Sequence, residues 1–166
     1  MDVIFLHGLE SGPHGSKFQS MKAAGWNISA PDCEGIANVG ERVEIARRAL
    51  PAAEEPVVLV GSSFGGLTAA RLFSSLADDR ASAQVHGLLL LAPAFHVPAA
   101  ESITTCHPNT VILHGTQDDV VPIESSRAFA ARFGCELVEV EDGHRLAASH
   151  PVILRLLDQV AGTPRP

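Results

Sequence analysis

Residues 56–68 read PVVLVGSSFGGLT, so an apolar, largely β-branched run passes directly into the pattern Gly-x-Ser-x-Gly at residues 61–65. This order predicts a buried strand, a sharp turn and the start of a helix. Such a turn exposes the hydroxyl group of its middle residue, Ser63. Gly61 and Gly65 suit it because a Cβ atom at either position would collide with the neighbouring strand or helix. A structural serine in a tight turn is the alternative, but the setting favours a nucleophile.

Short apolar runs alternate with amphipathic, helix-like stretches along the whole chain. We expect strands over residues 2–7, 27–31, 56–61, 87–92, 109–114 and 136–141. Residues 88–91 are four leucines, and a strand that is apolar on both faces is typical of a parallel sheet covered by helices. The pattern predicts an α/β fold with a doubly wound, mostly parallel six-stranded sheet flanked by helices. We expect one domain over residues 1–160 and a frayed tail over residues 161–166.

Composition excludes several classes of function. The 166 residues carry a net charge of −7, which gives no electrostatic footprint for nucleic acid. No apolar stretch is long enough to predict a membrane span. Cys33, Cys106 and Cys135 are odd in number and far apart, so reduced thiols are expected rather than disulfides. Residues 2–6 look like a strand rather than a signal peptide, and the expected location is therefore cytoplasmic.

The histidine pattern predicts no metal site and no cofactor. Of the eight histidines, His7 and His114 each precede a glycine at a strand end, where a side chain that satisfies loop backbone groups is the favoured interpretation. Neither H-x-x-x-H nor H-E-x-x-H occurs in the sequence.

A glycine-rich loop at residues 8–17 raises the alternative of a phosphate-binding site. The Walker pattern needs Gly-Lys-Ser/Thr in direct succession, whereas Ser16 separates Gly15 from Lys17. Glu10 in the same loop would repel phosphate. A flexible wall of another pocket is therefore the favoured interpretation.

A serine hydroxyl needs a general base, and the base needs a carboxylate to orient it. Asp118 follows the fifth expected strand and His144 follows the sixth, so both belong to the sheet edge of Ser63. The chain order Ser63, Asp118, His144 is the one that this architecture uses. Asp119 is adjacent to Asp118, and we prefer Asp118 as the residue that orients the histidine.

A tetrahedral intermediate also needs backbone donors for its oxyanion. The N–H of Phe64, at the start of the expected helix, is one candidate, and the N–H of Leu9 is the other. Phe95 and Val120 flank catalytic loops and are candidates for lining an acyl pocket. Ordinary core or loop packing explains Phe95 and Val120 equally well.

These segments together resemble the signatures of the α/β-hydrolase fold: His7-Gly8-Leu9, residues 61–66, residues 114–122 and Gly143-His144. Residues 6–13 with the later GSSFGG are similar to the small, lidless YqiA-type esterases. The resemblance implies a serine hydrolase with a triad of Ser63, Asp118 and His144. It also implies an oxyanion hole at Leu9 and Phe64.

The chain differs from larger members of that family in two respects. It begins at the strand that carries the oxyanion loop, and residues 93–108 are too few to build a helical cap. Both differences predict an open, shallow site. A sheet without the strands that usually precede this one has an open edge, and burial of that edge in a homodimer is one possible arrangement.

We therefore expect a hydrolase of small, uncharged acyl esters that acts on a small-molecule substrate. The same residues would suit thioester or amide cleavage, or lyase chemistry, because one fold hosts many reactions. A hydrolase-fold protein that serves as a binding or scaffolding module is the alternative from another class.

Overall fold

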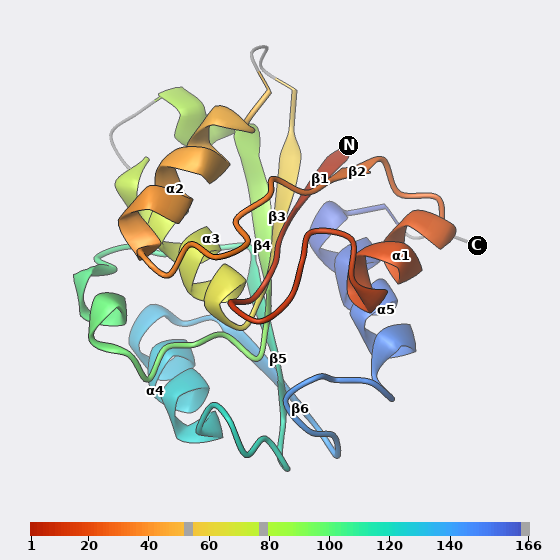
Figure 1. Ribbon diagram of the computed structural model, residues 1–166, viewed down its shortest axis with the longest axis vertical. Helices are drawn as coiled ribbons and strands as arrows, with labels where there is room; N and C mark the ends of the chain where they lie inside the picture. The colour runs from red at the N-terminus through yellow and green to blue at the C-terminus, as the bar shows by residue number, and fades with distance from the viewer. Residues whose placement is uncertain (52–54, 77–79, 164–166) are drawn as a thin grey trace.

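The computed structural model describes residues 1–51, 55–76 and 80–163. These residues form a six-stranded sheet in the order β2-β1-β3-β4-β5-β6, and every pair of neighbours is parallel. Figure 1 shows the sheet between two helical layers. The strands are β1 (Asp2–Leu6), β2 (Ile28–Ser29), β3 (Val57–Ser62), β4 (Val85–Leu91), β5 (Thr110–Gly115) and β6 (Glu136–Val140). The predicted doubly wound α/β fold is confirmed.

The helices divide between the two faces of the sheet. They are α1 (Ser16–Ala23), α2 (Val39–Arg48), α3 (Phe64–Ser75), α4 (Ile123–Phe133) and α5 (His150–Ala161), with short 3₁₀ turns η1 (Arg80–Gln84) and η2 (Pro98–Ser102). Helices α2, α3 and α4 cover one face, and α1 and α5 cover the other (Figure 1). Successive side chains of a strand point to opposite faces, so Leu88 and Leu90 pack with the first group and Leu89 and Leu91 with the second.

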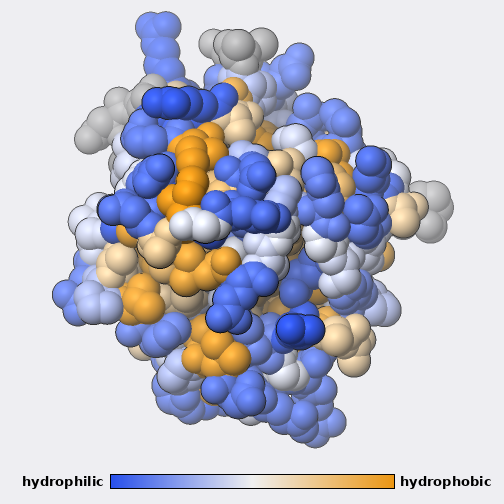
Figure 2. All heavy atoms as spheres, viewed as in Figure 1, coloured by the Kyte–Doolittle hydropathy of each residue, from blue (hydrophilic) through white to orange (hydrophobic). Residues whose placement is uncertain are grey.

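The surface leaves few large apolar side chains in solvent. Figure 2 shows one face covered mainly by hydrophilic side chains, with apolar patches between them. Met1, Leu9 and Val120 are the exposed large hydrophobic residues of the described chain. Leu9 and Val120 follow β1 and β5, so they flank the carboxyl edge of the sheet. No helix in the described ranges has the length and apolar character that crossing a membrane requires.

The sequence pattern does not indicate helix α1, which begins within the glycine-rich stretch. Gly15 precedes this helix without a side-chain cap, and only Phe18 and Met21 are buried along it. At the other terminus, Ala161 still belongs to α5, and residues 164–166 of the expected tail lie outside the described residues.

The connection between β4 and β5 bears on access to the site. Residues 92–109 are all described, and their only helical element is the short turn η2. No cap domain therefore covers the carboxyl edge of the sheet, as the length of this segment predicts.

Candidate active site

Ser63 lies at the junction of β3 and α3 in a backbone conformation that side chains rarely adopt. Its φ is 55° and its ψ is −117°, and such a conformation persists only where the surroundings enforce it. The Ser63 N–H donates to the carbonyl of Leu91 over 2.8 Å. A Cβ atom at Gly61 would collide with the carbonyl of Gly65, and one at Gly65 would collide with the carbonyl of Leu6. Both glycines are thus required by close backbone approach.

Three side chains from the carboxyl edge form a hydrogen-bonded line. His144 Nε2 lies 3.0 Å from Ser63 Oγ, and His144 Nδ1 lies 2.7 Å from Asp118 Oδ2. An ionised carboxylate only accepts hydrogen bonds, so Nδ1 carries the hydrogen and Nε2 is free to accept from the serine hydroxyl. The imidazole can therefore take the Ser63 proton without first changing its tautomer.

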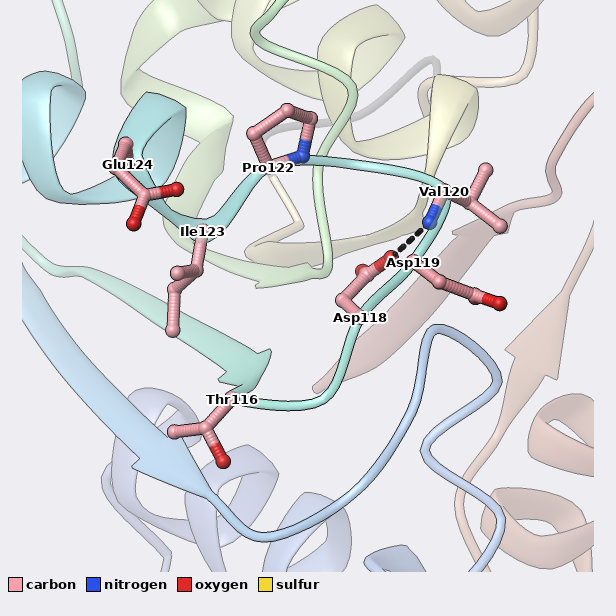
Figure 3. Close-up of a pocket in the computed structure, with 7 residues that line it drawn as sticks. All are labelled: Thr116, Asp118, Asp119, Val120, Pro122, Ile123 and Glu124. Carbon is pink, nitrogen blue, oxygen red and sulfur yellow. Dashed lines mark hydrogen bonds between the residues drawn. The ribbon is translucent and has the colours of Figure 1, made fainter.

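Asp118 rather than Asp119 makes this contact. Asp118 Oδ1 accepts hydrogen bonds from the N–H groups of Val120 at 2.9 Å and Val121 at 2.8 Å. Burial alone would raise the pKa of Asp118, but the hydrogen bonds from Val121, His144 and Val120 outweigh it and hold the pKa below its ordinary value. Figure 3 shows the Asp119 carboxylate directed away from that of Asp118. The turn thus keeps Asp118 ionised and fixed.

His114 supports the same carboxylate, a role that the sequence did not reveal. His114 Nε2 lies 3.1 Å from the carbonyl of Val121 and 3.0 Å from Asp118 Oδ2. Both partners are acceptors, so Nε2 carries the hydrogen, and Nδ1 pairs with Ser126 Oγ at 2.7 Å. Burial lowers the pKa of His114, while the contacts to Val121 and Asp118 raise it in part. A neutral imidazole thus stands behind Asp118.

The loop that carries His144 is organised by Asp142. Its Oδ1 accepts from the N–H of Gly143 at 2.8 Å, and its Oδ2 accepts from the N–H of Ala148 at 2.9 Å and from Ser149 Oγ at 2.7 Å. A carboxylate that closes a loop on itself in this way limits the positions open to His144. Sequence patterns alone did not single out Asp142, because its partners become apparent only from the conformation of the loop.

The segments that carry the proposed oxyanion donors adjoin the nucleophile. A Cβ atom built at Gly8 would be 3.5 Å from Ser63 Cβ, so the loop after β1 passes directly beside the serine. Phe64 is the first residue of α3, where an N–H has no intrahelical acceptor. In the described part of the chain, no backbone acceptor pairs with the N–H of Leu9. Both N–H groups thus lack a backbone acceptor among the residues that the structure describes, and they remain the candidates for an oxyanion hole.

A cavity of about 340 Å³ adjoins the site on the side of Asp118 (Figure 3). Its lining is Thr116, Asp118, Asp119, Val120, Pro122, Ile123 and Glu124. Val120, which is 58% exposed, belongs to it, whereas Phe95 is buried and stacks on Phe129 with ring centroids 3.9 Å apart. Ser63 and His144 do not line this cavity, and of the three aligned residues only Asp118 does.

Comparison with protein families gives a match over most of the chain. The sequence model of a family described as serine hydrolase matches residues 37–150, which include Ser63, Asp118 and His144. A search of curated proteins found none that matches the chain.

Solved structures match along nearly the whole length. An alpha/beta superfamily protein from Xanthomonas campestris pv. campestris has 25% identity and a TM-score of 0.78, covering 97% of this chain and 98% of that one. A monoacylglycerol lipase from Paleococcus ferrophilus has 16% identity and a TM-score of 0.73, covering 95% and 94%. Est1E from Butyrivibrio proteoclasticus has 16% identity and a TM-score of 0.75, covering 97% and 88%. The last two show a shared fold alone.

Proposed function

Because the chain belongs to the serine hydrolase family, we propose that it cleaves small, uncharged acyl esters through an acyl-Ser63 intermediate. The observation that carries this proposal is the line of hydrogen bonds from Ser63 through His144 to Asp118. A serine in this setting is a nucleophile because the imidazole takes its proton as the oxygen attacks.

In the first half of the reaction, Ser63 Oγ attacks the ester carbonyl while His144 Nε2 accepts the hydroxyl proton. Asp118 stabilises the imidazolium that forms and holds its orientation. His144 then returns the proton to the leaving alcohol, and the acyl group stays on Ser63.

The oxygen of the tetrahedral intermediate accepts hydrogen bonds from the N–H groups of Leu9 and Phe64. Removal of one such donor costs about 3 kcal/mol of transition-state stabilisation in other hydrolases. In the second half, His144 activates a water molecule, which attacks the acyl-Ser63 ester and releases the acid.

The surroundings of the site support an uncharged, accessible substrate. No cap covers the edge, and the exposed side chains of Leu9 and Val120 offer apolar contact to an acyl or leaving group. Asp119 and Glu124 line the adjoining cavity and would repel an anionic substituent.

A fluorophosphonate probe with mass-spectrometric mapping of the adduct tests the proposal. We expect a stoichiometric adduct on Ser63 in the wild-type protein and none in Ser63→Ala or His144→Ala. Ser62→Ala changes the neighbouring hydroxyl and is the matched control, which should still react. No adduct from the folded wild-type protein would reject the nucleophile and favour the binding-module alternative.

A substrate panel then separates the acyl chemistries. Short p-nitrophenyl esters are expected to be turned over faster than matched thioesters and anilides. Faster cleavage of the thioester or the anilide would keep the acyl-Ser63 mechanism and reassign the substrate class.

A further inference from the structure

Arg42 is an arginine of helix α2 whose side chain is only 1% exposed. Its guanidinium donates to backbone carbonyls alone: Nε to Ile36 at 2.6 Å, Nη1 to His7 at 2.8 Å, and Nη2 to Cys33 at 3.0 Å and to Gly8 at 3.4 Å. One side chain thus joins the segment after β1, which holds the expected oxyanion loop, to the segment before α2.

The charge of this group makes its burial costly. Among the carboxylates that the structure describes, none forms an ion pair with Arg42. A buried cation without a counter-ion is disfavoured unless hydrogen bonds satisfy it, and here four carbonyl contacts do so. A planar fork of donors can reach several carbonyls at once, which a lysine ammonium cannot do in the same geometry.

Two of the carbonyls that Arg42 binds, those of His7 and Gly8, belong to peptide units of the expected oxyanion loop. The peptide unit is planar and trans, so its C=O and N–H point in opposite directions. A donor that holds the carbonyl of Gly8 from one side therefore directs the N–H of Leu9 to the other side. The His7 ring acts in the same sense, because its Nδ1 lies 2.8 Å from the Gly8 carbonyl and its Nε2 accepts from the N–H of Cys33 at 3.0 Å.

The guanidinium also reaches the second half of the expected oxyanion hole. Arg42 Cζ lies 5.3 Å from the centre of the Phe64 ring, within the range of a cation–π contact. Phe64 supplies the other candidate N–H, at the first residue of α3. Arg42 thus contacts both the backbone before Leu9 and the ring of Phe64.

We infer that Arg42 is a positioning residue of the oxyanion hole, which it braces from the side opposite the substrate. This inference rests on the proposed hydrolase function. The guanidinium fixes the direction of the Leu9 N–H and the place of Phe64. By binding the carbonyl oxygens it also polarises the peptide groups whose N–H ends would face the oxyanion. Arg42 therefore stabilises the transition state rather than the bound substrate, because negative charge on the carbonyl oxygen develops only in the transition state.

Kinetics of Arg42→Met and Arg42→Lys test the inference, with Arg48→Met as the matched control. Arg48 is exposed on the same helix. The fluorophosphonate first titrates the number of reactive Ser63 sites. The rate of p-nitrophenyl acetate hydrolysis is then divided by that number, so that unfolded molecules do not lower the measured kcat. We expect kcat per titrated serine to fall about 100-fold in Arg42→Met, near the loss seen when one oxyanion donor is removed. KM should change less than about threefold, since the ground-state carbonyl gains little from the hole.

Arg42→Lys keeps the charge and the aliphatic stem, and we expect an intermediate loss of kcat and a folded protein. If Arg42→Met does not fold, Arg42→Lys alone decides the question. A merely structural role would lower the number of titrated serines and leave kcat per serine unchanged, and that outcome would overturn the inference. A wild-type protein that forms no Ser63 adduct would instead overturn the proposed hydrolase function, and this inference with it.

Discussion

His114 Nε2 lies 3.0 Å from Asp118 Oδ2, the oxygen that His144 Nδ1 approaches from its other side at 2.7 Å. The carboxylate thus sits between two imidazoles with different surroundings. His114 is fully buried, whereas the side chain of His144 is 19% exposed. The buried ring lowers the freedom of Asp118, and the accessible ring faces the serine.

Replacement of His114 should therefore weaken the site through Asp118. Hydrogen bonds to charged groups are worth about 1.5–3 kcal/mol. We expect His114→Leu to lower kcat/KM about 10- to 100-fold, as losses of that size imply. His114→Gln keeps an N–H donor and should retain most of the activity. Steady-state kinetics of both variants check this, with exposed His86→Gln as control; equal losses in the Leu and Gln variants would contradict it.

The same residue makes stability depend on pH. Burial lowers the pKa of His114 below its ordinary 6.5, so the unfolded chain binds a proton that the folded chain resists. The contribution of neutral His114 to the free energy of unfolding is complete above pH 6.5. It is lost as the pH falls toward the folded-state pKa, with a slope of at most about 1.4 kcal/mol per pH unit. Urea unfolding measures the free energy of unfolding at pH 7.5 and at pH 5.5. Between these two pH values it should fall less for His114→Gln than for the wild-type protein. Identical losses would argue against a neutral buried His114.

The paired thiols give a prediction away from the site. Cys135 Sγ lies 3.8 Å from Cys106 Sγ, and its hydrogen bond lowers the pKa of Cys106 to about 7 although burial opposes this. Burial raises the pKa of Cys33. We expect iodoacetamide to label Cys106 with a midpoint near pH 7, and Cys135→Ala to move that midpoint upward. Mass spectrometry of labelling against pH measures both.

Hydrolysis should survive this alkylation. Cys106 precedes β5, at the sheet edge opposite to the one that carries Ser63. Loss of activity in step with Cys106 labelling would show that the two edges are coupled.

Gly65 should tolerate no side chain. A Cβ atom there would collide with the carbonyl of Leu6 and lie 2.8 Å from that of His7, and backbone cannot move aside as a flexible side chain can. We expect Gly65→Ala to destabilise the fold by at least about 3 kcal/mol, at the upper end of overpacking costs. Gly15→Ala, whose nearest atom would be 3.8 Å away, should cost about 1 kcal/mol or less as an N-cap change. Urea midpoints of the two variants give the comparison.

The sequence predicts well the features that depend on a short stretch of residues or on the order of the strands in the sheet. The apolar strands and the two glycines around Ser63 act locally, and the parallel sheet then brings the loops after β3, β5 and β6 to one edge. That edge is where Ser63, Asp118 and His144 meet. Local pattern and topology were sufficient there because each residue lies within four positions of the end of a strand.

The features that the sequence does not predict depend on contacts between distant segments. Arg42 follows Val39 at helical spacing and so lies on the buried stripe of α2, but nothing local indicates that carbonyls 6 to 35 residues away satisfy it. Helix α1 buries only two side chains, too few for a periodic signal.

Ser63 and His144 are 81 positions apart in the sequence, and this separation determines when the folding chain becomes able to react. During synthesis the serine elbow emerges well before its base, and β6 can pair only with an already placed β5. Helix α5 then contacts β4, β5 and α1, which joins the last part of the chain to the first. Contacts of such long sequence separation form slowly. A nascent or truncated chain therefore carries an inert serine, and recovered hydrolysis reports the completion of folding rather than its beginning.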